Sequence, residues 1–452
     1  MDSLPSAAND SAAEADTLRH FGVAASTSVL VANMIGTGVF TALGFQALVL
    51  RSGAALLALW GIGGLVALCG ALVYAELGTM FPHCGGEYVY LGRAWHPLAG
   101  FLGGWVSMTV GFAAPIALAG IAFGRYVSAV VPLPPLVASL IVVGVVAGVH
   151  LAGLHAATRF QLLITGTQLA LIAAFVAAGL HFSPAVPLSL SLDGDAWREI
   201  VSPSFAVSLV YVSYAFTGWN AAGYIAGEIR DPQRAIPRAL IVGTSLVTAL
   251  YVLLNWTFLR TVPLAELAGR VEVGALSARA MFGPTGAALM SATIATVLIA
   301  TISAMVLGGS RVTQAVMADL PRARAIGQRA TNGVPRNAIL AQLALIAALL
   351  LTNSFEQVML YAGFTLNLMS LLTVLGMMQL RRRQPALPRP YRTWGYPCTA
   401  LAYVALSVWT LGTLLRERPL ESISGLGTLA IGTAVWWWAR RATSRIVASP
   451  SL

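Results

Sequence analysis

Long apolar stretches alternate with short polar connectors along nearly the whole chain. A helix needs about 20 apolar residues to cross the hydrocarbon core of a bilayer, and stretches of about this length recur here. They lie near residues 21–50, 54–80, 97–131, 136–151, 158–181, 203–227, 239–260, 285–317, 338–352, 356–380, 397–415 and 422–439. We therefore predict an all-α polytopic membrane protein with 12 transmembrane helices.

Two of these stretches are interrupted near their middle. The first contains Ile35-Gly36-Thr37-Gly38, and each glycine costs ~1 kcal/mol relative to alanine in a helix interior. The sixth contains Gly218 and Asn220 among hydroxyl groups at mid-span. Backbone leaves the helix at membrane depth only where it is buried in protein or lines a cavity. We expect discontinuous helices at both places, with a small solute bound to the freed backbone groups.

The two interruptions are five predicted helices apart, which indicates an internal repeat. Discontinuous helices at corresponding places in two halves point to a transporter binding site. The halves are residues 21–181 and 203–380, inverted because each has an odd number of crossings, and residues 397–439 supply the last two helices. Residues 1–20 lack a basic n-region and a cleavage site, so we expect a disordered cytoplasmic tail there. A second cytoplasmic tail is expected at 440–452.

Composition supports embedding in a membrane and indicates an orientation. The chain is 57% hydrophobic and 10% charged, with a mean hydropathy of +0.77, whereas soluble proteins average ~25% charged residues. All 27 basic residues are arginine, and most fall on one side of the predicted topology. The positive-inside rule makes that side cytoplasmic, which places both termini in the cytoplasm and the protein in the cell (inner or plasma) membrane. The net charge of +10 then reflects orientation and contact with anionic lipid rather than nucleic-acid binding.

Residues that could form a metal site or a disulfide are scattered. Cys69, Cys84 and Cys398 have no ligand spacing and fall in a helix or on the cytoplasmic side. His150 and His155 are five residues apart and so face different sides of a helix. We therefore expect no metal and no cofactor. A membrane enzyme is disfavoured because no nucleophile–base pair or phosphate loop is recognisable.

Four polar residues are candidates for gating or coupling. Glu76 lies near the end of the second predicted helix, and Glu87 lies in the cytoplasmic connector that follows, where it could pair with Arg93. Gln168 lies among aliphatic residues of the fifth predicted helix, and Tyr251 lies in the seventh. A polar side chain inside the membrane can also serve only to join two helices.

Four motifs resemble the amino acid–polyamine–organocation superfamily, and within it the L-amino-acid transporters and their bacterial relatives. They are Ile35-Gly36-Thr37-Gly38-Val39-Phe40, the Glu76-to-Tyr90 run with Gly85-Gly86-Glu87-Tyr88, the Phe216-to-Arg238 run, and the segment from Pro388 to Pro397. They occur in the order seen in that family and extend over nearly the whole chain. The resemblance implies a 5+5 inverted-repeat fold and transport by alternating access.

The resemblance also implies where a substrate binds. In this family, N–H groups and a hydroxyl at the first break bind the substrate carboxylate, carbonyls at the sixth-helix break receive the ammonium, and an aromatic lid precedes the sixth-helix glycine. A helix N-terminus carries roughly +0.5 charge and free N–H donors, which suit a carboxylate. The matching residues are Asn33, Ile35, Gly36, Thr37, Gly38, Tyr214 as the lid, Ala215, Thr217, Gly218 and Asn220. Met305 lies where some relatives place a substrate-side aromatic, and it is a fifth candidate for gating or coupling.

Departures from the family pattern bear on substrate and coupling. Arginine–agmatine exchangers carry a glutamate two residues past the sixth-helix glycine, where this chain has Asn220. Glu76 and Glu228 lie at cytoplasmic helix ends, so no carboxylate is expected at mid-span to neutralise a dication. The lysine that many L-amino-acid transporters place near Gln168 is absent. So is the cysteine that links some relatives to a heavy chain, and we expect no disulfide-linked heavy-chain partner.

The leading prediction is a secondary active transporter of neutral L-amino acids, working by exchange or proton-linked uptake. One alternative is an exchanger of cationic amino acids or polyamines. Another is a receptor that binds an amino acid without cycling. The sequence leaves open which amino acid is carried and what drives the cycle.

Overall fold

The computed structural model describes residues 22–447 except 83–84, 129–130, 153, 182–185, 187–190, 192, 225, 227–228, 319, 321–322, 328–333 and 353. The tail predicted at 1–20, Cys84 and Glu228 lie outside the described residues. Every regular element in the described part is a helix. The all-α prediction is therefore confirmed.

Within the described residues, eight helices are long and apolar enough to span a membrane by length and composition. They are Ser26–Gln46, Gly53–Met80, Pro97–Ser128, Pro135–Ala152, Pro232–Thr261, Val273–Ala318, Phe355–Arg383 and Cys398–Glu417. Three shorter apolar helices are Gly166–His181, Pro203–Ala215 and Arg336–Leu351. Several spans in one chain make this a multi-pass membrane protein, and the count of 12 crossings stays a prediction.

Several helices begin and end close to their predicted limits, because apolar length and turn residues set them. These are α4 (Gly53–Met80), α8 (Pro135–Ala152), α9 (Leu154–His181), α16 (Arg336–Thr352), α17 (Phe355–Arg383) and α18 (Cys398–Glu417). Capping residues fix some of the starts. Ser52 accepts a hydrogen bond from the Ala55 N–H at the start of α4, and Ser354 and Gln357 form a capping box at the start of α17.

Other helices run beyond the apolar stretch. α13 (Pro232–Thr261) and α15 (Val273–Ala318) begin earlier than predicted, and α19 (Pro419–Val447) ends later. Pro232 is tolerated in the first turn of α13, where its missing N–H has no partner to lose. α15 is kinked at Gly283, which has a φ of 72° and precedes Pro284. Hydropathy alone does not detect the polar extensions of α13 and α19, and the Gly283-Pro284 interruption conceals the earlier start of α15.

The third predicted helix is not uniform. It consists of α6 (Pro97–Val106), a π-helical segment η1 (Ser107–Phe112) and α7 (Ala113–Ser128). π-helical segments are rare and occur frequently at functional sites. Four short helices complete the described part: α5 (Glu87–Ala94), α10 (Gly194–Ile200), α12 (Ala221–Tyr224) and α14 (Leu264–Leu267).

Both predicted interruptions are present. The first apolar stretch is divided into α2 (Val23–Met34) and α3 (Thr37–Gln46), with Ile35 and Gly36 in extended conformations between them. The sixth is divided into α11 (Pro203–Ala215) and α12, with residues 216–220 in turns. We call these the first break and the second break.

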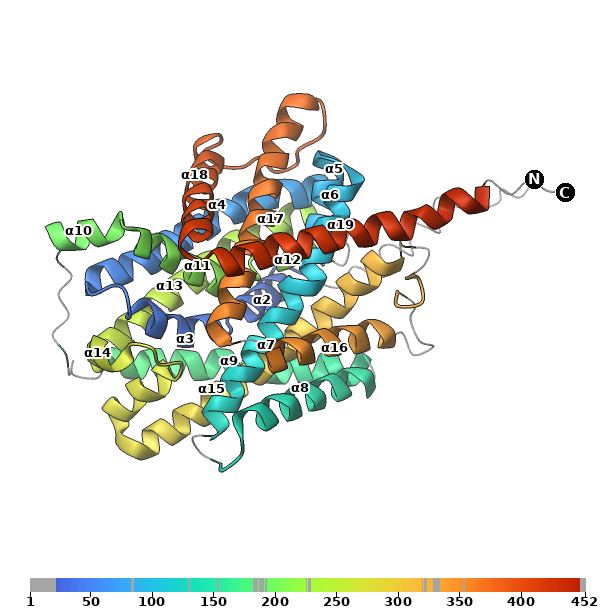
Figure 1. Ribbon diagram of the computed structural model, residues 1–452. Helices are drawn as coiled ribbons and strands as arrows, with labels where there is room; N and C mark the ends of the chain where they lie inside the picture. Colours follow the sequence, from blue (N-terminus) through green and yellow to red (C-terminus); the bar gives the residue numbers. More distant parts are fainter. Residues whose placement is uncertain are drawn as a thin grey trace, which may run out of the picture.

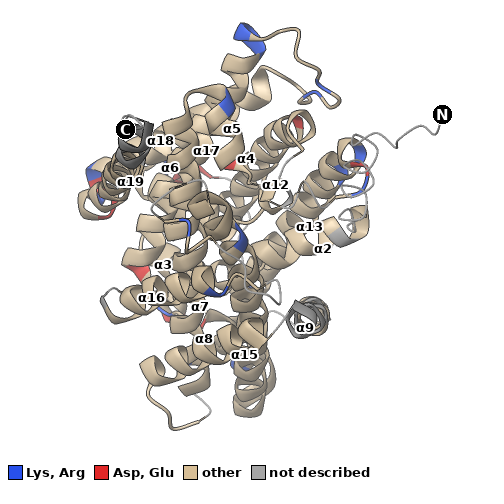
Figure 2. Ribbon diagram, turned by 90° about the vertical axis from the view of Figure 1, so that its right-hand side faces the viewer, with Lys and Arg blue, Asp and Glu red and all other residues tan. Residues whose placement is uncertain are grey.

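The helices around the breaks hold them at the centre of the molecule (Figure 1). α13 packs against α4 and α2, α15 packs against α7 and α9, and α11 contacts α3, α17 and α18. In Figure 2 nearly all of the ribbon is free of charged residues. Charge is therefore scarce in the packed interior, and each buried ionisable group needs its own explanation.

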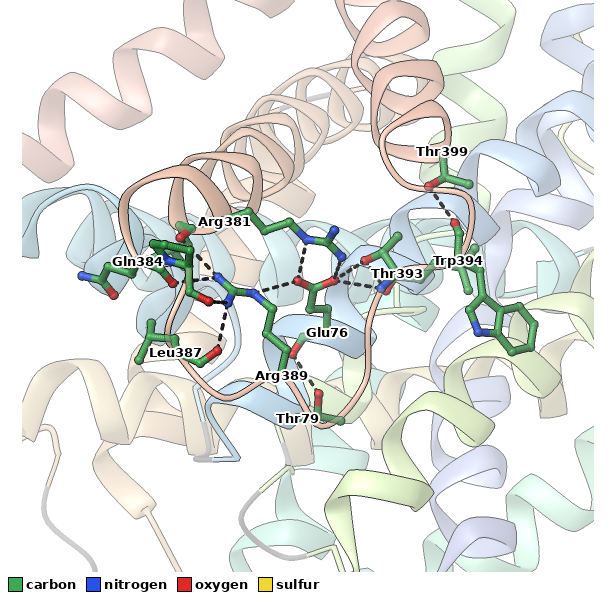
Figure 3. Close-up of polar contacts among 12 residues, drawn as sticks. Glu76, Thr79, Arg381, Gln384, Leu387, Arg389, Thr393, Trp394 and Thr399 are labelled. Atoms are coloured by element: carbon green, nitrogen blue, oxygen red, sulfur yellow. Dashed lines mark hydrogen bonds and ion pairs between the residues drawn. The ribbon is translucent and has the colours of Figure 1, made fainter.

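Glu76 is one such group, and it fastens the end of α4 to the end of α17 (Figure 3). Its carboxylate is fully buried and accepts a hydrogen bond from Arg381 Nε at 2.8 Å, with a second ion pair to the same guanidinium. Arg389 Nε lies 3.4 Å from the other side of the carboxylate, and Thr393 donates to it from both N–H and hydroxyl at 2.8 Å.

Arg389 in turn orders the connector between α17 and α18. Its guanidinium donates to the carbonyls of Pro385, Leu387, Leu380 and Gln384 at 2.9–3.2 Å. The connector is thus folded around one buried anion with two cations. A carboxylate with this many donors is a structural junction, and removing it leaves two buried guanidinium groups unpaired.

We expect Glu76→Ala to destabilise the protein strongly, because breaking a buried ion pair on one side costs ~3–5 kcal/mol. The measurement is the thermal unfolding midpoint of the purified protein in detergent. Asp195→Asn is the matched control, since the Asp195–Arg198 pair is more than four-fifths exposed and should contribute nothing measurable. Equal midpoints for the two variants would contradict the assignment of Glu76 as a junction.

Candidate functional site

The two breaks lie in direct contact. A Cβ atom built on Gly38, in the first turn of α3, would lie 2.5 Å from the Cα of Ala215 at the end of α11. On the other side, a Cβ built on Gly218 would lie 2.6 Å from the carbonyl oxygen of Asn33. Gly218 also has a φ of 103°, which L-residues with side chains rarely adopt. Glycine is required at both positions because the backbones approach closely, and at Gly218 also because of its backbone conformation.

Tyr251 joins the two breaks through one hydroxyl group. Its oxygen lies 2.6 Å from the carbonyl oxygen of Met34 and 3.0 Å from that of Ala215, and the side chain is fully buried. Met34 and Ala215 are the last residues of α2 and α11, whose final carbonyls have no partner within their own helices. The phenol, supplied by α13, has a single O–H, which is therefore shared between one carbonyl of each break.

The carbonyl of Ile35, in the first break, accepts hydrogen bonds from side chains of α9 and α15. Gln168 Nε2 on α9 donates to the carbonyl oxygen of Ile35 at 2.7 Å, and the Thr301 hydroxyl on α15 donates to it at 3.1 Å. Gln168 lies near the position where many L-amino-acid transporters have a lysine, which this chain lacks. Its neutral amide supplies the donor that reaches the first break, so the break is held without a buried cation.

The start of α3 has backbone N–H groups without partners inside the helix. Gly36 is its N-cap and has no side chain that could cap the first turn, and its backbone hydrogen-bonds the Tyr251 hydroxyl. The first N–H groups of a helix have no partner within the helix and carry the positive end of its dipole. The hydroxyls of Thr37 and Tyr214 face each other across the contact between α3 and α11. All of these residues are buried, so this part of the site is closed in the present conformation.

A cavity adjoins the breaks and gathers six of the predicted residues. They are Asn33, Glu87, Thr217, Gly218, Asn220 and Met305. The cavity is also lined by residues that the sequence did not single out, chiefly Ser107 and Phe112 of η1, Tyr224 of α12, and Met369 and Ser370 of α17. The π-helical segment thus contributes directly to the wall. Tyr224 lies inside the Phe216-to-Arg238 motif, which is the signal that could have identified it.

A second cavity lies on the other side of the second break. Tyr214 lines it together with Ser213, Asn367 and Tyr403. The two cavities share Thr217, Trp219, Leu366 and Ser370. The segment that contains Thr217 and Trp219 therefore separates the two cavities.

The remaining predicted residues are placed outside these cavities. Ile35, Gly36, Thr37, Gly38, Ala215, Gln168 and Tyr251 form the buried support just described. Glu76 belongs to the junction with Arg381 and Arg389. No group of three or more His, Cys, Asp or Glu residues that could hold a metal ion occurs in the described part of the chain.

The predicted pair between Glu87 and Arg93 is wrong. Glu87 is the first residue of α5 and Arg93 lies in its last turn. The Glu87 carboxylate instead accepts hydrogen bonds from the Tyr74 hydroxyl at 2.9 Å and from Asn220 Nδ2 at 2.5 Å. The helix turns Glu87 inwards while Arg93 is exposed, and only the fold reveals that the carboxylate faces the second break.

Comparison with known proteins agrees with this geometry. The amino acid permease family model matches residues 21–421. The chain belongs to the amino acid permease family. The resemblance to the amino acid–polyamine–organocation superfamily is thereby confirmed, and amino acid transport is the function class of this permease.

Three relatives illustrate the range of the permease's similarity. Mouse Asc-type amino acid transporter 1 is 28% identical over 442 residues, covering 92% of this chain and 80% of the relative. The serine/threonine exchanger SteT of Bacillus subtilis is 27% identical over 413 residues, covering 88% and 91%. The human large neutral amino acids transporter small subunit 2 is 26% identical over 437 residues, covering 93% and 80%.

Gly38→Ala should disturb the permease where the breaks touch. An added methyl group would overlap the Ala215 backbone, and overpacking of this kind costs ~1–3 kcal/mol. We expect a lower thermal unfolding midpoint and a loss of amino acid exchange in proteoliposomes. Gly61→Ala in α4 is the control, because a Cβ there meets nothing within 4 Å. A Gly38→Ala protein indistinguishable from Gly61→Ala would show that the breaks are not in contact.

Tyr251→Phe should loosen both breaks while keeping the aromatic packing. The lost hydroxyl leaves the carbonyls of Met34 and Ala215 without that donor, and one such bond is worth ~1 kcal/mol. We expect a slower exchange rate and a lower unfolding midpoint. Tyr361→Phe removes a comparable hydroxyl that bonds Thr428, away from the breaks. Exchange should be lowered more by the first change than by the second.

Proposed function

We propose that the permease is a secondary active transporter of neutral L-amino acids that works by alternating access. The observation that carries this proposal is the pair of facing helix interruptions, one of which presents the N–H groups of a helix start and the other the carbonyls of a helix end. A carboxylate suits the N-terminus of α3 and an ammonium suits the carbonyls at the end of α11. A zwitterion therefore fits between Gly36–Gly38 and Tyr214–Gly218 without a compensating side-chain charge.

The helix contacts support a 5+5 inverted repeat with 12 crossings. If α2 corresponds to α11, α4 to α13, α7 to α15, α8 to α16 and α9 to α17, several contacts between helices of the two halves have counterparts. α2 packs on α13 as α11 packs on α4, and α15 packs on α9 as α7 packs on α17. The pairs α8 with α15 and α16 with α7 correspond as well, as do α7 with α8 and α15 with α16. Rocking of one half against the other would open the site to alternate sides.

The proposed site has a carboxylate part and a side-chain part. Ile35, Gly36, Thr37 and Gly38 would bind the substrate carboxylate, and Tyr214, Ala215 and Thr217 would receive the ammonium beneath the Tyr214 ring. Asn33, Gly218, Asn220 and Met305 line the adjoining cavity, which would hold the substrate side chain. Both termini would be cytoplasmic, as the arginine distribution predicts, and no disulfide-linked heavy chain would be needed.

The relatives favour a neutral substrate. The Bacillus subtilis relative is named for serine and threonine, and the human relative is named for large neutral amino acids. Both names describe amino acids with uncharged side chains, but the side chains differ in size. At 26–28% identity, the size of the preferred side chain is not transferable. We therefore propose neutral L-amino acids as a class.

A cationic amino acid or polyamine is the second candidate, and one observation favours it. The sequence argument against a cation assumed that no carboxylate reaches the site, because Glu87 follows the second predicted helix in a connector. The structure corrects that premise, since Glu87 lines the cavity beside Asn220. Inhibition of labelled leucine or alanine uptake by arginine or putrescine would support this second candidate.

Counterflow in proteoliposomes tests the leading proposal. Vesicles loaded with one unlabelled amino acid should accumulate the labelled form of a neutral amino acid. Thr37→Ala and Tyr214→Ala should each lower this rate about tenfold or more, because a hydrogen bond to a charged group is worth ~1.5–3 kcal/mol and 1.4 kcal/mol is tenfold.

Thr296→Ala is the matched control for the threonine variant. The Thr296 hydroxyl donates only to the carbonyl of Ala292 in its own helix, so its loss should leave counterflow unchanged. Wild-type rates in both Thr37→Ala and Tyr214→Ala would refute the site. Stoichiometric binding without flux in the wild-type protein would indicate a receptor instead.

A further inference from the structure

Glu87 is held inside the cavity by the turn that precedes it. Gly85 and Gly86 have φ values of 135° and 52°, which reverse the chain before α5 begins. The Gly86 N–H donates to the carbonyl of Gly223 at 3.3 Å, which ties this turn to α12. The Glu87 side chain is only 4% exposed and lines the same cavity as Gly218 and Asn220.

The hydrogen bonds of Glu87 are unevenly divided between its oxygens. Oε1 accepts from the Tyr74 hydroxyl and from Asn220 Nδ2. Oε2 is buried and has no hydrogen-bond partner among the described residues. A carboxylate can accept at both oxygens, whereas a carboxylic acid uses one of them as an O–H donor. One oxygen is therefore fixed, and the other is available for a proton.

Among the described residues Glu87 also has no cationic partner, unlike the buried carboxylate of Glu76. No ion pair within the described ranges includes Glu87, whereas Glu76 contacts two arginines. Within the part of the chain that the structure describes, the titratable groups that face Glu87 are tyrosines. They are Tyr74 on α4, Tyr224 on α12 and Tyr403 on α18, with Tyr90 on its own helix next to Tyr74 and Tyr224. The charged residue at the other end of α5, Arg93, is exposed.

An anion in such surroundings is costly. Burying a charge without a counter-charge costs several kcal/mol, and a protein commonly avoids this by protonation or by binding a cation. A zwitterionic amino acid has no net charge, so its binding does not neutralise the Glu87 carboxylate. Binding of a proton to Glu87 does neutralise it.

On this basis, and resting on the proposed transport function, we propose that Glu87 carries the proton that couples amino acid uptake to a proton gradient. The Oε2–H bond forms with a proton from water on one side of the membrane while the cavity is open there. It breaks when the cavity opens to the other side and the proton returns to water. No group is oxidised or reduced, and each cycle moves one proton with one amino acid.

Asn220 connects this proton to the substrate site. Its Nδ2 donates to Oε1 of Glu87 and lies 3.3 Å from the Tyr224 hydroxyl, two residues beyond Gly218 of the second break. An ionised carboxylate attracts this amide more strongly than a protonated one does. Loss of the proton would therefore pull the second break towards α5, which gives protonation a route to the conformation of the site.

The test compares two readouts on the same proteoliposomes containing the full chain. The first is counterflow of labelled L-serine and L-leucine at equal pH on both sides, which reports the transport function. The second is accumulation of the same amino acids driven by an acidic exterior, with an internal pH dye recording proton entry. In the wild-type protein we expect accumulation against a gradient and amino acid-dependent acidification.

In Glu87→Gln we expect gradient-driven accumulation to fall at least tenfold and amino acid-dependent acidification to vanish. Counterflow should fall by a smaller factor, because the amide keeps an oxygen that accepts from Tyr74. Glu87→Asp keeps a titratable group and should retain acidification. It provides the second test of the proposal if Glu87→Gln does not fold. Glu266→Gln, an exposed glutamate in α14, should leave both readouts unchanged.

Three outcomes would overturn the proposal. Wild-type counterflow without any acidification would show that transport is not proton-coupled, while leaving the transport function intact. Unchanged acidification in Glu87→Gln would assign the proton to another group. Transport of arginine or putrescine by the wild type that Glu87→Gln abolishes would make Glu87 a ligand for a cationic substrate. Absence of wild-type counterflow for every amino acid would instead refute the transport function itself.

Discussion

The contact between the two helix interruptions is the constraint on which the rest of this structure depends. Two stretches of irregular backbone at the centre of an apolar molecule expose carbonyl and N–H groups that lipid cannot satisfy. Here each break helps to bury the other, with Gly38 against Ala215 and Gly218 against Asn33. Tyr251, Gln168 and Thr301 supply donors for the carbonyls that remain. The surrounding helices are arranged to deliver those three side chains.

The same logic explains how the permease uses its few buried charges. Glu76 is surrounded by donors and by two guanidinium groups, so it stays ionised and joins α4 to the connector after α17. Among the described residues, Glu87 has two neutral donors on one oxygen, no cationic partner and a second oxygen without a hydrogen bond. The first arrangement is suited to a permanent link. The second is suited to a group whose charge changes during the cycle.

A large part of the fold follows from local patterns in the sequence. Apolar length alone located the long helices, and Gly36-Thr37-Gly38 and Gly218 located both breaks. The start of α13 and the end of α19 were missed because polar residues continue these helices, and the start of α15 was missed because Gly283-Pro284 interrupts its pattern. The π-helical segment at Ser107–Phe112 was missed for a related reason, since nothing in its side chains differs from an ordinary apolar helix.

The sequence by itself determined the class of protein, the number and place of the breaks, and most residues of the candidate site, because hydropathy and glycine act locally along the chain. The tertiary structure decided the partners. It placed Glu87 beside Asn220 rather than Arg93, gave Gln168 the carbonyl of Ile35, and separated Glu76 from the cavity. Those relations join residues more than a hundred positions apart, and only the packing of helices brings them within hydrogen-bonding distance.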